Sequence, residues 1–136
     1  MKQALLDTDT LSYFFKQEKA VVDKVDKYLQ EFGSVNISVV TYYEIMNGLL
    51  YKDARKQLEK FETFISLNTI IPLSENSARK SAEIYAELRK TGNAIGHNDI
   101  LIAGTAIEND MVLITNNAKH FNRVEGLEIE NWKIAE

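Results

Sequence analysis

Three acidic residues lie in places where the surrounding pattern is apolar. Asp7 directly follows a short aliphatic run, Glu44 lies within an aromatic and aliphatic stretch, and Asp99 opens a third apolar stretch. A buried carboxylate is costly unless it pairs with a cation or binds a metal ion. Carboxylate oxygens suit a hard divalent cation such as Mg²⁺. Because no excess of cations accompanies them, the three acids together predict a divalent-metal site.

Each acid also has a structural interpretation. We expect Asp9 or Thr10 to cap the helix that follows, since Asp and Thr are good N-cap residues. Asp99 could serve only the positive end of a helix dipole, and Glu44 could lie on the exposed stripe of its helix. Taken one at a time, Glu44 and Asp99 favour such roles, and the combination of all three acids favours metal binding. Asp7 favours function by itself, because it directly follows a strand expected to be buried on both faces.

A polar segment follows a later apolar run. Thr115 stands at the tip of an expected strand, as Asp7 does, and Asn117 can bind a metal-bound water or a phosphate oxygen. The alternative is a turn rich in asparagine, which is common. We expect His97 and His120 on the surface or against substrate, not as bases. Three side chains here could supply local positive charge: Lys119, His120 and Arg123.

The elements that position these residues alternate between strand and helix. Short apolar or β-branched runs predict strands at residues 4–6, 35–38, 69–73, 112–115 and 127–130. Helical periodicity predicts helices at residues 10–15, 20–31, 41–50, 53–65, 75–90 and 99–108. Gly33 should end the second helix, while Ser74 and Asn98 should cap the last two. This alternation predicts one α/β domain over residues 1–136, a three-layer sandwich with a parallel sheet of four to five strands.

The helix at residues 41–50 is apolar over so much of its surface that it should be buried or shared with a partner chain. It and the next helix carry more aromatic and aliphatic side chains than a small core readily uses. These are Tyr42, Tyr43, Met46, Leu50, Tyr51, Phe61 and Phe64. We therefore expect part of this surface to form a protein interface.

Composition narrows the class of protein. The chain has 136 residues, 45% of them hydrophobic, which fits one folded domain. The absence of cysteine excludes disulfides and thiolate metal sites. A net charge of −4 argues against a broad nucleic-acid coat, so RNA binding would need a local basic patch and metal ions. With no signal peptide ahead of the first strand and no apolar run of membrane length, we expect a cytoplasmic protein without membrane contact.

Five segments, in order along the whole chain, resemble the PIN-domain nucleases, and specifically the VapC toxins of prokaryotic toxin–antitoxin pairs. They are residues 5–9, 43–48, 98–103, 115–121 and 124–132. The resemblance implies a small parallel-sheet sandwich, Mg²⁺ or Mn²⁺, and endonucleolytic cleavage of RNA such as tRNA or rRNA. It also implies a homodimer that a cognate VapB-like antitoxin neutralises.

The resemblance also implies roles for individual residues. Asp7 and Asp99 would anchor the metal ion, and Glu44 would complete its shell or orient the attacking water. Thr115 and Asn117 would position a water or a phosphate oxygen. Many members carry a fourth acid where this chain has Asn117, so a second metal ion would have fewer anionic ligands.

Two alternatives to a metal-dependent nuclease remain open from the sequence. Asp7 and Asp9 after a strand also resemble the aspartates of haloacid-dehalogenase-type phosphatases. Against this interpretation, Asp99 follows a polar loop where that fold needs a strand. The second alternative is a PIN module that binds RNA or protein without cleaving, and Asn117 is the only residue that supports it.

Overall fold

Five short strands form the sheet around which the chain folds. The computed structural model describes residues 1–134. The strands are β1 (Ala4–Leu6), β2 (Asn36–Ser38), β3 (Thr69–Ile71), β4 (Val112–Ile114) and β5 (Ile129–Glu130). Their order is β3-β2-β1-β4-β5, and every neighbouring pair is parallel. The predicted parallel sheet is therefore confirmed. β3 lies at an edge and stops before Pro72, which has no N–H for the ladder.

Helices connect the strands. They are α1 (Thr8–Phe15), α2 (Lys19–Phe32), α3 (Val39–Tyr51), α4 (Arg55–Leu67), α5 (Glu75–Lys90), α6 (His97–Glu108) and α7 (Ala118–Phe121). Gly33 ends α2 in the left-handed conformation at φ 81°, and the Ser74 side chain caps α5, both as predicted. The single turn α7 was not predicted, because four residues are too few to show helical periodicity. Within residues 1–134, no helix has the length and apolar character that a membrane span requires.

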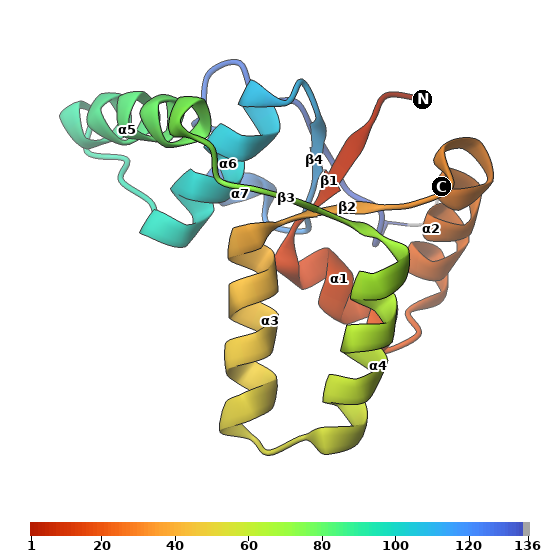
Figure 1. Cartoon of the computed structure of the whole chain (residues 1–136). Coiled ribbons are helices and arrows are strands. Elements are labelled where there is room, and N and C mark those ends of the chain that lie inside the picture. Colours follow the sequence, from red (N-terminus) through yellow and green to blue (C-terminus); the bar gives the residue numbers. More distant parts are fainter. Residues whose placement is uncertain (135–136) are drawn as a thin grey trace.

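The sheet separates two apolar cores. Ala4 and Leu6 of β1 point into a core with residues of α1, α2 and α4, whereas Leu5 points into a second core with residues of α5 and α6. This alternation follows from the two-residue period of a strand. Figure 1 shows α6 and α2 on opposite sides of β1 and β4. The predicted three-layer arrangement is confirmed.

The start of α1 differs from the prediction. Asp7 itself is the N-cap residue, and its Oδ1 accepts a hydrogen bond from the Thr8 N–H over 2.9 Å. The prediction that Asp9 or Thr10 caps this helix is therefore wrong. Asp9 lies in the first turn, and the Thr10 hydroxyl donates to the Ile114 carbonyl over 2.9 Å, which ties α1 to β4.

The start of α6 also differs. Gly96 is its N-cap residue, and Asn98 lies inside the first turn. The prediction that Asn98 caps this helix is therefore wrong. The Asn98 side chain is instead free to reach another element. The start of α3 is two residues earlier than predicted, because the Ser38 hydroxyl accepts from the Thr41 N–H over 3.0 Å and caps the helix there.

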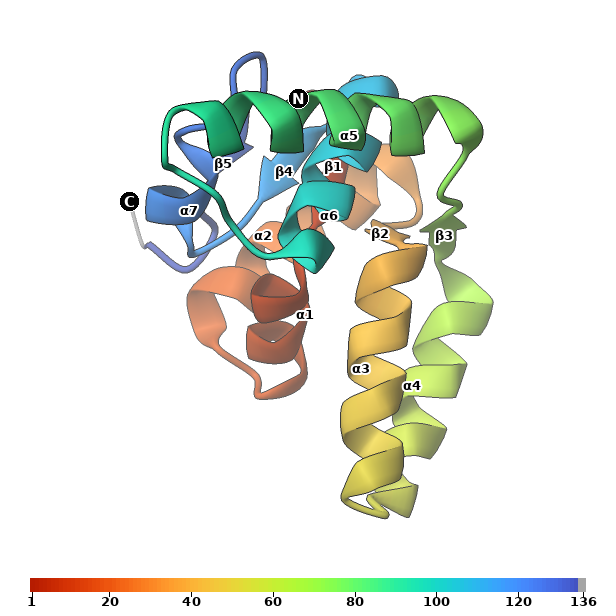
Figure 2. The same cartoon turned by 90° about the vertical axis from the view of Figure 1, so that its left-hand side faces the viewer.

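The helices α3 and α4 run side by side away from the sheet (Figures 1 and 2). Only Val40 and Thr41 of α3 are fully buried, so the prediction of a buried helix is wrong for most of its length. Tyr43 and Leu50 are each 60% exposed and Tyr51 is 90% exposed. The sheet is too small to cover a helix of this length. The other part of the prediction, a surface shared with a partner chain, stays a prediction.

The helices α5 and α6 pack closely at Gly104, which gives a prediction about stability. A Cβ on residue 104 would lie 2.0 Å from Ser81 Oγ and 2.9 Å from the Ser77 carbonyl oxygen. Because the helices must separate to admit a methyl group, we expect Gly104→Ala to lower the free energy of unfolding by about 1–3 kcal/mol. Urea denaturation measures this change.

Gly48 provides the matched control, because a Cβ there meets nothing within 4 Å. Gly48→Ala should raise the free energy of unfolding by about 0.5–1 kcal/mol, since alanine loses less backbone entropy in a helix. If both substitutions stabilise the protein, the space beside Gly104 admits a methyl group and the predicted clash with α5 is wrong.

Candidate active site

The candidate site lies where the strand order reverses. The chain passes from β1 to β2 and β3 on one side, and β4 and β5 lie on the other. Ligands of open parallel sheets bind beyond the carboxyl ends of the strands at such a point. Asp7 follows β1 and Thr115 follows β4, and Thr115 Oγ1 donates a hydrogen bond to Asp7 Oδ2 over 2.8 Å. Two of the predicted site residues are therefore in direct contact.

Asp7 is a buried carboxylate with acidic neighbours. Its side chain is 5% exposed. The pKa of Asp7 is raised from 3.8 to about 7, mainly by burial and also by the negative charges of Asp9 and Asp99. Hydrogen bonds from Thr115 and Thr8 oppose this shift. Asp9 is held nearby by the Asn116 N–H, which donates to its Oδ2 over 3.1 Å.

Glu44 reaches the same edge from α3. It is half-buried, less than its apolar surroundings predict. Thr8 Oγ1 donates to Glu44 Oε1 over 2.6 Å, and Asn98 Nδ2 donates to Glu44 Oε2 over 3.2 Å. The Thr8 N–H also donates to Asp7 Oδ1, so Thr8 bridges the carboxylates of Glu44 and Asp7. The predicted acid of α3 is therefore linked through Thr8 to the acid that follows β1.

Asp99 lies in the first turn of α6 and is half-buried. Its Oδ2 is 3.3 Å from Nδ1 of His120, an exposed residue of α7. The expectation that His97 and His120 lie on the surface is confirmed, and His120 additionally contacts a predicted site residue. His97 stacks on Tyr85, with ring centroids 4.8 Å apart.

Asn117 stands at the start of α7. Its backbone N–H donates to Thr115 Oγ1 over 3.0 Å, and its carbonyl accepts from the His120 N–H over 3.1 Å. Its half-buried side chain makes no hydrogen bond with any residue that the structure describes. The turn role weighed in the sequence analysis is therefore fulfilled by the backbone, which leaves the amide group of the side chain available for a ligand.

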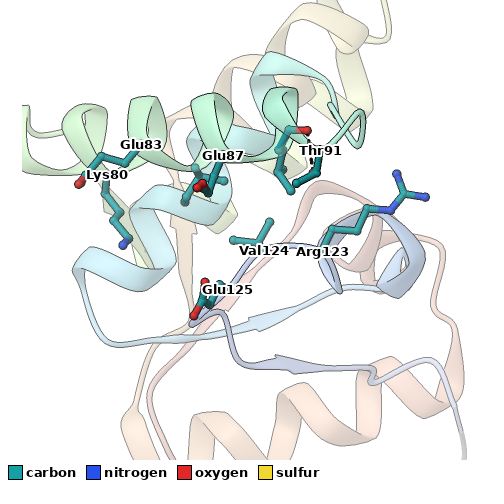
Figure 3. Close-up of a pocket in the computed structure, with 9 residues that line it drawn as sticks. Lys80, Glu83, Glu87, Thr91, Arg123, Val124 and Glu125 are labelled. Carbon is teal, nitrogen blue, oxygen red and sulfur yellow. Dashed lines mark hydrogen bonds between the residues drawn. The ribbon is translucent and has the colours of Figure 1, made fainter.

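A surface cavity of about 410 Å³ lies elsewhere, between α5 and residues 123–125 (Figure 3). Arg123 lines it, together with the charged side chains of Lys80, Glu83 and Glu87. The predicted metal ligands and Thr115 and Asn117 do not line this cavity. Arg123 lies beside this cavity, with its guanidinium pointing away from the other labelled side chains (Figure 3), and Lys119 is exposed on α7.

The acids fit a hard divalent cation by their chemistry. Among residues 1–134, no lysine or arginine forms an ion pair with Asp7, Asp9, Glu44 or Asp99. All four are oxygen donors, which Mg²⁺ and Mn²⁺ prefer. In the same described part of the chain, no three acidic or histidine side chains converge closely enough to hold one ion. Mutual repulsion of uncompensated carboxylates is the physical reason to expect such spacing.

Thr8 and Asn98 contact a predicted site residue, Glu44, although neither was itself predicted from the sequence to lie at the site. The sequence pattern predicted a helix cap at Asn98, and Thr8 was predicted to lie before the first helix, with no role of its own. Each is a polar residue beside a predicted acid at the start of a helix, and this adjacency was the available signal. Which carboxylate each side chain reaches could not be read from the sequence, because Glu44 is 36 residues from Thr8 and 54 from Asn98.

Comparison with known proteins identifies similar chains. Residues 4–127 match the family described as PIN domain. The chain is 32% identical over 133 residues to "Ribonuclease VapC2" of Haemophilus influenzae, covering 97% of this chain and 99% of that protein. It is 30% identical over 133 residues to "tRNA(fMet)-specific endonuclease VapC" of Shigella flexneri, with the same coverage.

Solved structures give the same picture. A DNA-bound VapBC from Salmonella typhimurium contains a chain with a TM-score of 0.87 and 29% identity, covering 97% of this chain and 99% of that one. VapBC2 from Rickettsia felis, bound to a promoter DNA fragment, has a TM-score of 0.86 and 30% identity, covering 95% and 98%.

Proposed function

We propose, since the chain belongs to the PIN domain family, that it is an endoribonuclease toxin of the VapC type that an antitoxin neutralises. One observation carries this function: hydrogen bonds link the residues around Asp7, Glu44 and Asp99 at the edge where the strand order reverses. Thr115 donates to Asp7, and the sequence neighbours of Asp7 and Asp99, Thr8 and Asn98, both donate to Glu44. Burying the ionised carboxylate of Asp7 without a cationic partner destabilises the folded state, as its raised pKa indicates. A residue kept at such a cost favours a functional role.

The reaction is hydrolysis of an RNA phosphodiester bond that depends on Mg²⁺ or Mn²⁺. When bound, the ion would lower the pKa of a water molecule and neutralise negative charge on the phosphate. Asp7 and Asp99 would hold it, and Glu44 would complete the shell or orient the water. The Thr115 hydroxyl holds Asp7 in place. The Asn117 amide, which makes no hydrogen bond within the described residues, would position a water or a phosphate oxygen.

The phosphatase alternative loses its basis. The residues before Asp99 form a loop and the first turn of α6, where that fold needs a strand. The PIN family match also runs through all the segments that carry the predicted acids. The second alternative, a PIN module that binds RNA or protein without cleaving, differs from the proposal in lacking activity.

A cleavage assay separates these two functions. The purified protein is incubated with single-stranded RNA and with tRNA, in Mg²⁺, in Mn²⁺ and in EDTA. We expect endonucleolytic products only with a divalent ion. RNA binding without products under every condition would identify a non-cleaving module.

A second part of the proposal concerns partners. A cavity of about 530 Å³ lies between α1, α3 and α4, with an apolar floor and a basic rim. Its floor includes Phe15, Ile45, Leu49 and Phe61, and its rim includes Lys16, Lys52 and Lys60. Such a groove suits a VapB-like antitoxin segment that carries apolar and acidic side chains. The exposed end of α3 and α4 beyond the groove would pair two copies of the chain as a homodimer.

We expect the isolated protein to be dimeric in solution and Leu50→Glu to shift it toward monomer. A charge on the exposed apolar end of α3 would be desolvated in an interface, which is costly. Light scattering over a range of concentrations measures the mass. Leu73→Glu, at an exposed leucine outside α3 and α4, is the control. A monomer at every concentration would contradict the dimer, and antitoxin binding unaffected by groove substitutions would contradict the groove.

Asn117 gives a prediction about metal affinity. The three predicted metal ligands bring a formal charge of −3 when all are ionised, and one divalent ion leaves about −1. A second ion should therefore bind weakly. We expect Asn117→Asp to lower the Mg²⁺ or Mn²⁺ concentration that gives half-maximal cleavage, because it adds a negative charge. Asn117→Ala should slow cleavage with a smaller effect on metal affinity. Metal titrations of cleavage by both variants measure these effects.

The aspartate variant also separates a ligand role from a turn role. Asp forms the same turns as Asn, so a residue that only shapes the start of α7 would leave the titration unchanged. Identical curves for wild type and Asn117→Asp would remove Asn117 from the site.

A further inference from the structure

Two uncharged side chains hold Glu44 at the acidic edge of the sheet. Thr8 donates to one of its carboxylate oxygens over 2.6 Å, and Asn98 donates to the other over 3.2 Å. Each oxygen therefore has its own donor, which fixes both the direction and the rotation of the carboxylate. A glutamate side chain has several rotatable bonds, and ordering it costs rotamer entropy that these hydrogen bonds offset.

The two donors occupy related places in the chain. Thr8 immediately follows Asp7, and Asn98 immediately precedes Asp99. The Thr8 N–H also donates to Asp7 Oδ1 over 2.9 Å, so one residue joins the carboxylates of β1 and α3. Asn98 joins Glu44 to the helical turn that carries Asp99. The sequence neighbours of two acids thus set the position of the third.

The chemical type of these donors matters. A lysine or arginine would hold Glu44 as firmly, but it would cancel the negative charge. A hydroxyl and an amide leave the net charge in place, and a carboxylate oxygen that accepts one hydrogen bond keeps a further acceptor position. The residues described by the structure include no lysine or arginine in ion-pair contact with Glu44. Partners of this kind orient metal ligands and increase metal affinity.

We propose that Thr8 and Asn98 are positioning residues that hold Glu44 ready to share a divalent ion with Asp7 and Asp99. This inference rests on the proposed function and deepens it. Thr41 supports the arrangement, because its Oγ1 lies 3.0 Å from Thr8 Oγ1 and steadies that hydroxyl from within α3.

Mn²⁺ binding to the RNA-free protein, measured by calorimetry, tests the proposal. Thr8→Val keeps the side-chain shape and the N–H that donates to Asp7, but removes the hydroxyl. We expect Thr8→Val and Asn98→Ala each to raise the Kd for Mn²⁺ about 10-fold or more. The Mn²⁺ concentration for half-maximal cleavage should rise in parallel, with little change in KM for RNA. Thr8→Ser should restore the wild-type values.

Matched controls remove a threonine hydroxyl or an asparagine amide elsewhere. Thr105→Val removes a buried hydroxyl that donates to the Leu101 carbonyl over 2.7 Å, and Asn76→Ala removes an exposed amide from α5. Neither should change Mn²⁺ affinity. If Thr8→Val does not fold, Asn98→Ala carries the test, because Asn98 is exposed.

The outcomes distinguish this inference from the function on which it rests. If Thr8→Val loses stability as Thr105→Val does but keeps wild-type Mn²⁺ affinity, the hydrogen bonds are only structural and the inference is overturned. If the wild-type protein neither binds Mn²⁺ nor cleaves RNA, the proposed function itself fails.

Discussion

Asp7→Asn is expected to lower the rate of RNA cleavage by about 100-fold or more, because it removes the buried carboxylate that we propose as a metal ligand. Asparagine has nearly the shape of aspartate and is an equally good N-cap, so α1 should keep its start. Asp99→Asn should have a comparable effect. Initial rates with a labelled RNA under saturating Mn²⁺ measure the loss.

The control for these variants is Asp26→Asn, at an exposed position of α2. It makes the same change in net charge without touching the site, so it should cleave like the wild type. Circular dichroism and urea denaturation show whether each variant is folded. Wild-type cleavage by a folded Asp7→Asn protein would remove Asp7 from the site, and the same holds for Asp99.

The same substitution is expected to stabilise the metal-free protein at alkaline pH. The folded state raises the pKa of Asp7 from 3.8 to about 7, a difference of about 3 units. At about 1.4 kcal/mol per unit, this ionised carboxylate costs the folded state about 4 kcal/mol above pH 7. Asparagine carries no charge, so Asp7→Asn should raise the free energy of unfolding by up to about this amount at pH 8.

The sign of the pH dependence follows from proton binding. Between pH 3.8 and about 7 the folded protein keeps a proton on Asp7 that the unfolded chain releases. The contribution of Asp7 to stability therefore falls as the pH rises through this range. Wild type and Asp7→Asn should have similar stability near pH 4 and diverge toward pH 8.

Urea denaturation in EDTA at several pH values tests this prediction. Asp26→Asn again serves as the control and should track the wild type at every pH. A stability difference that is independent of pH would show that Asp7 does not titrate in this range. Added Mn²⁺ should narrow the gap at pH 8, because a cation that binds the folded wild type stabilises it.

These two expectations describe one trade-off. Burial of Asp7 beside Asp9 and Asp99 lowers stability when the carboxylate is ionised, and the same burial concentrates negative charge where a cation is needed. A fold selected only for stability would place asparagine at this position. The retained aspartate is therefore best explained by function.

Part of this protein is determined locally by its sequence. The alternating runs of two-residue and 3.6-residue period define the parallel sheet and most of its helices. Gly33 and Ser74 end and begin their helices as predicted, because cap chemistry depends on a few neighbouring residues. The positions of Asp7 and Thr115 at the edge of the sheet were also predictable, since each is a polar residue that directly follows a buried strand.

The tertiary structure alone decided what the polar side chains contact. Asp7 caps α1 in place of Asp9 or Thr10, because backbone contacts with β4 fix where the strand stops. Asn98 reaches Glu44 instead of capping α6, and His120 reaches Asp99, because packing of α3, α6 and α7 brings distant residues together. Local propensity acts over a few residues, whereas these contacts depend on how whole helices pack, and this packing is not encoded in any short segment.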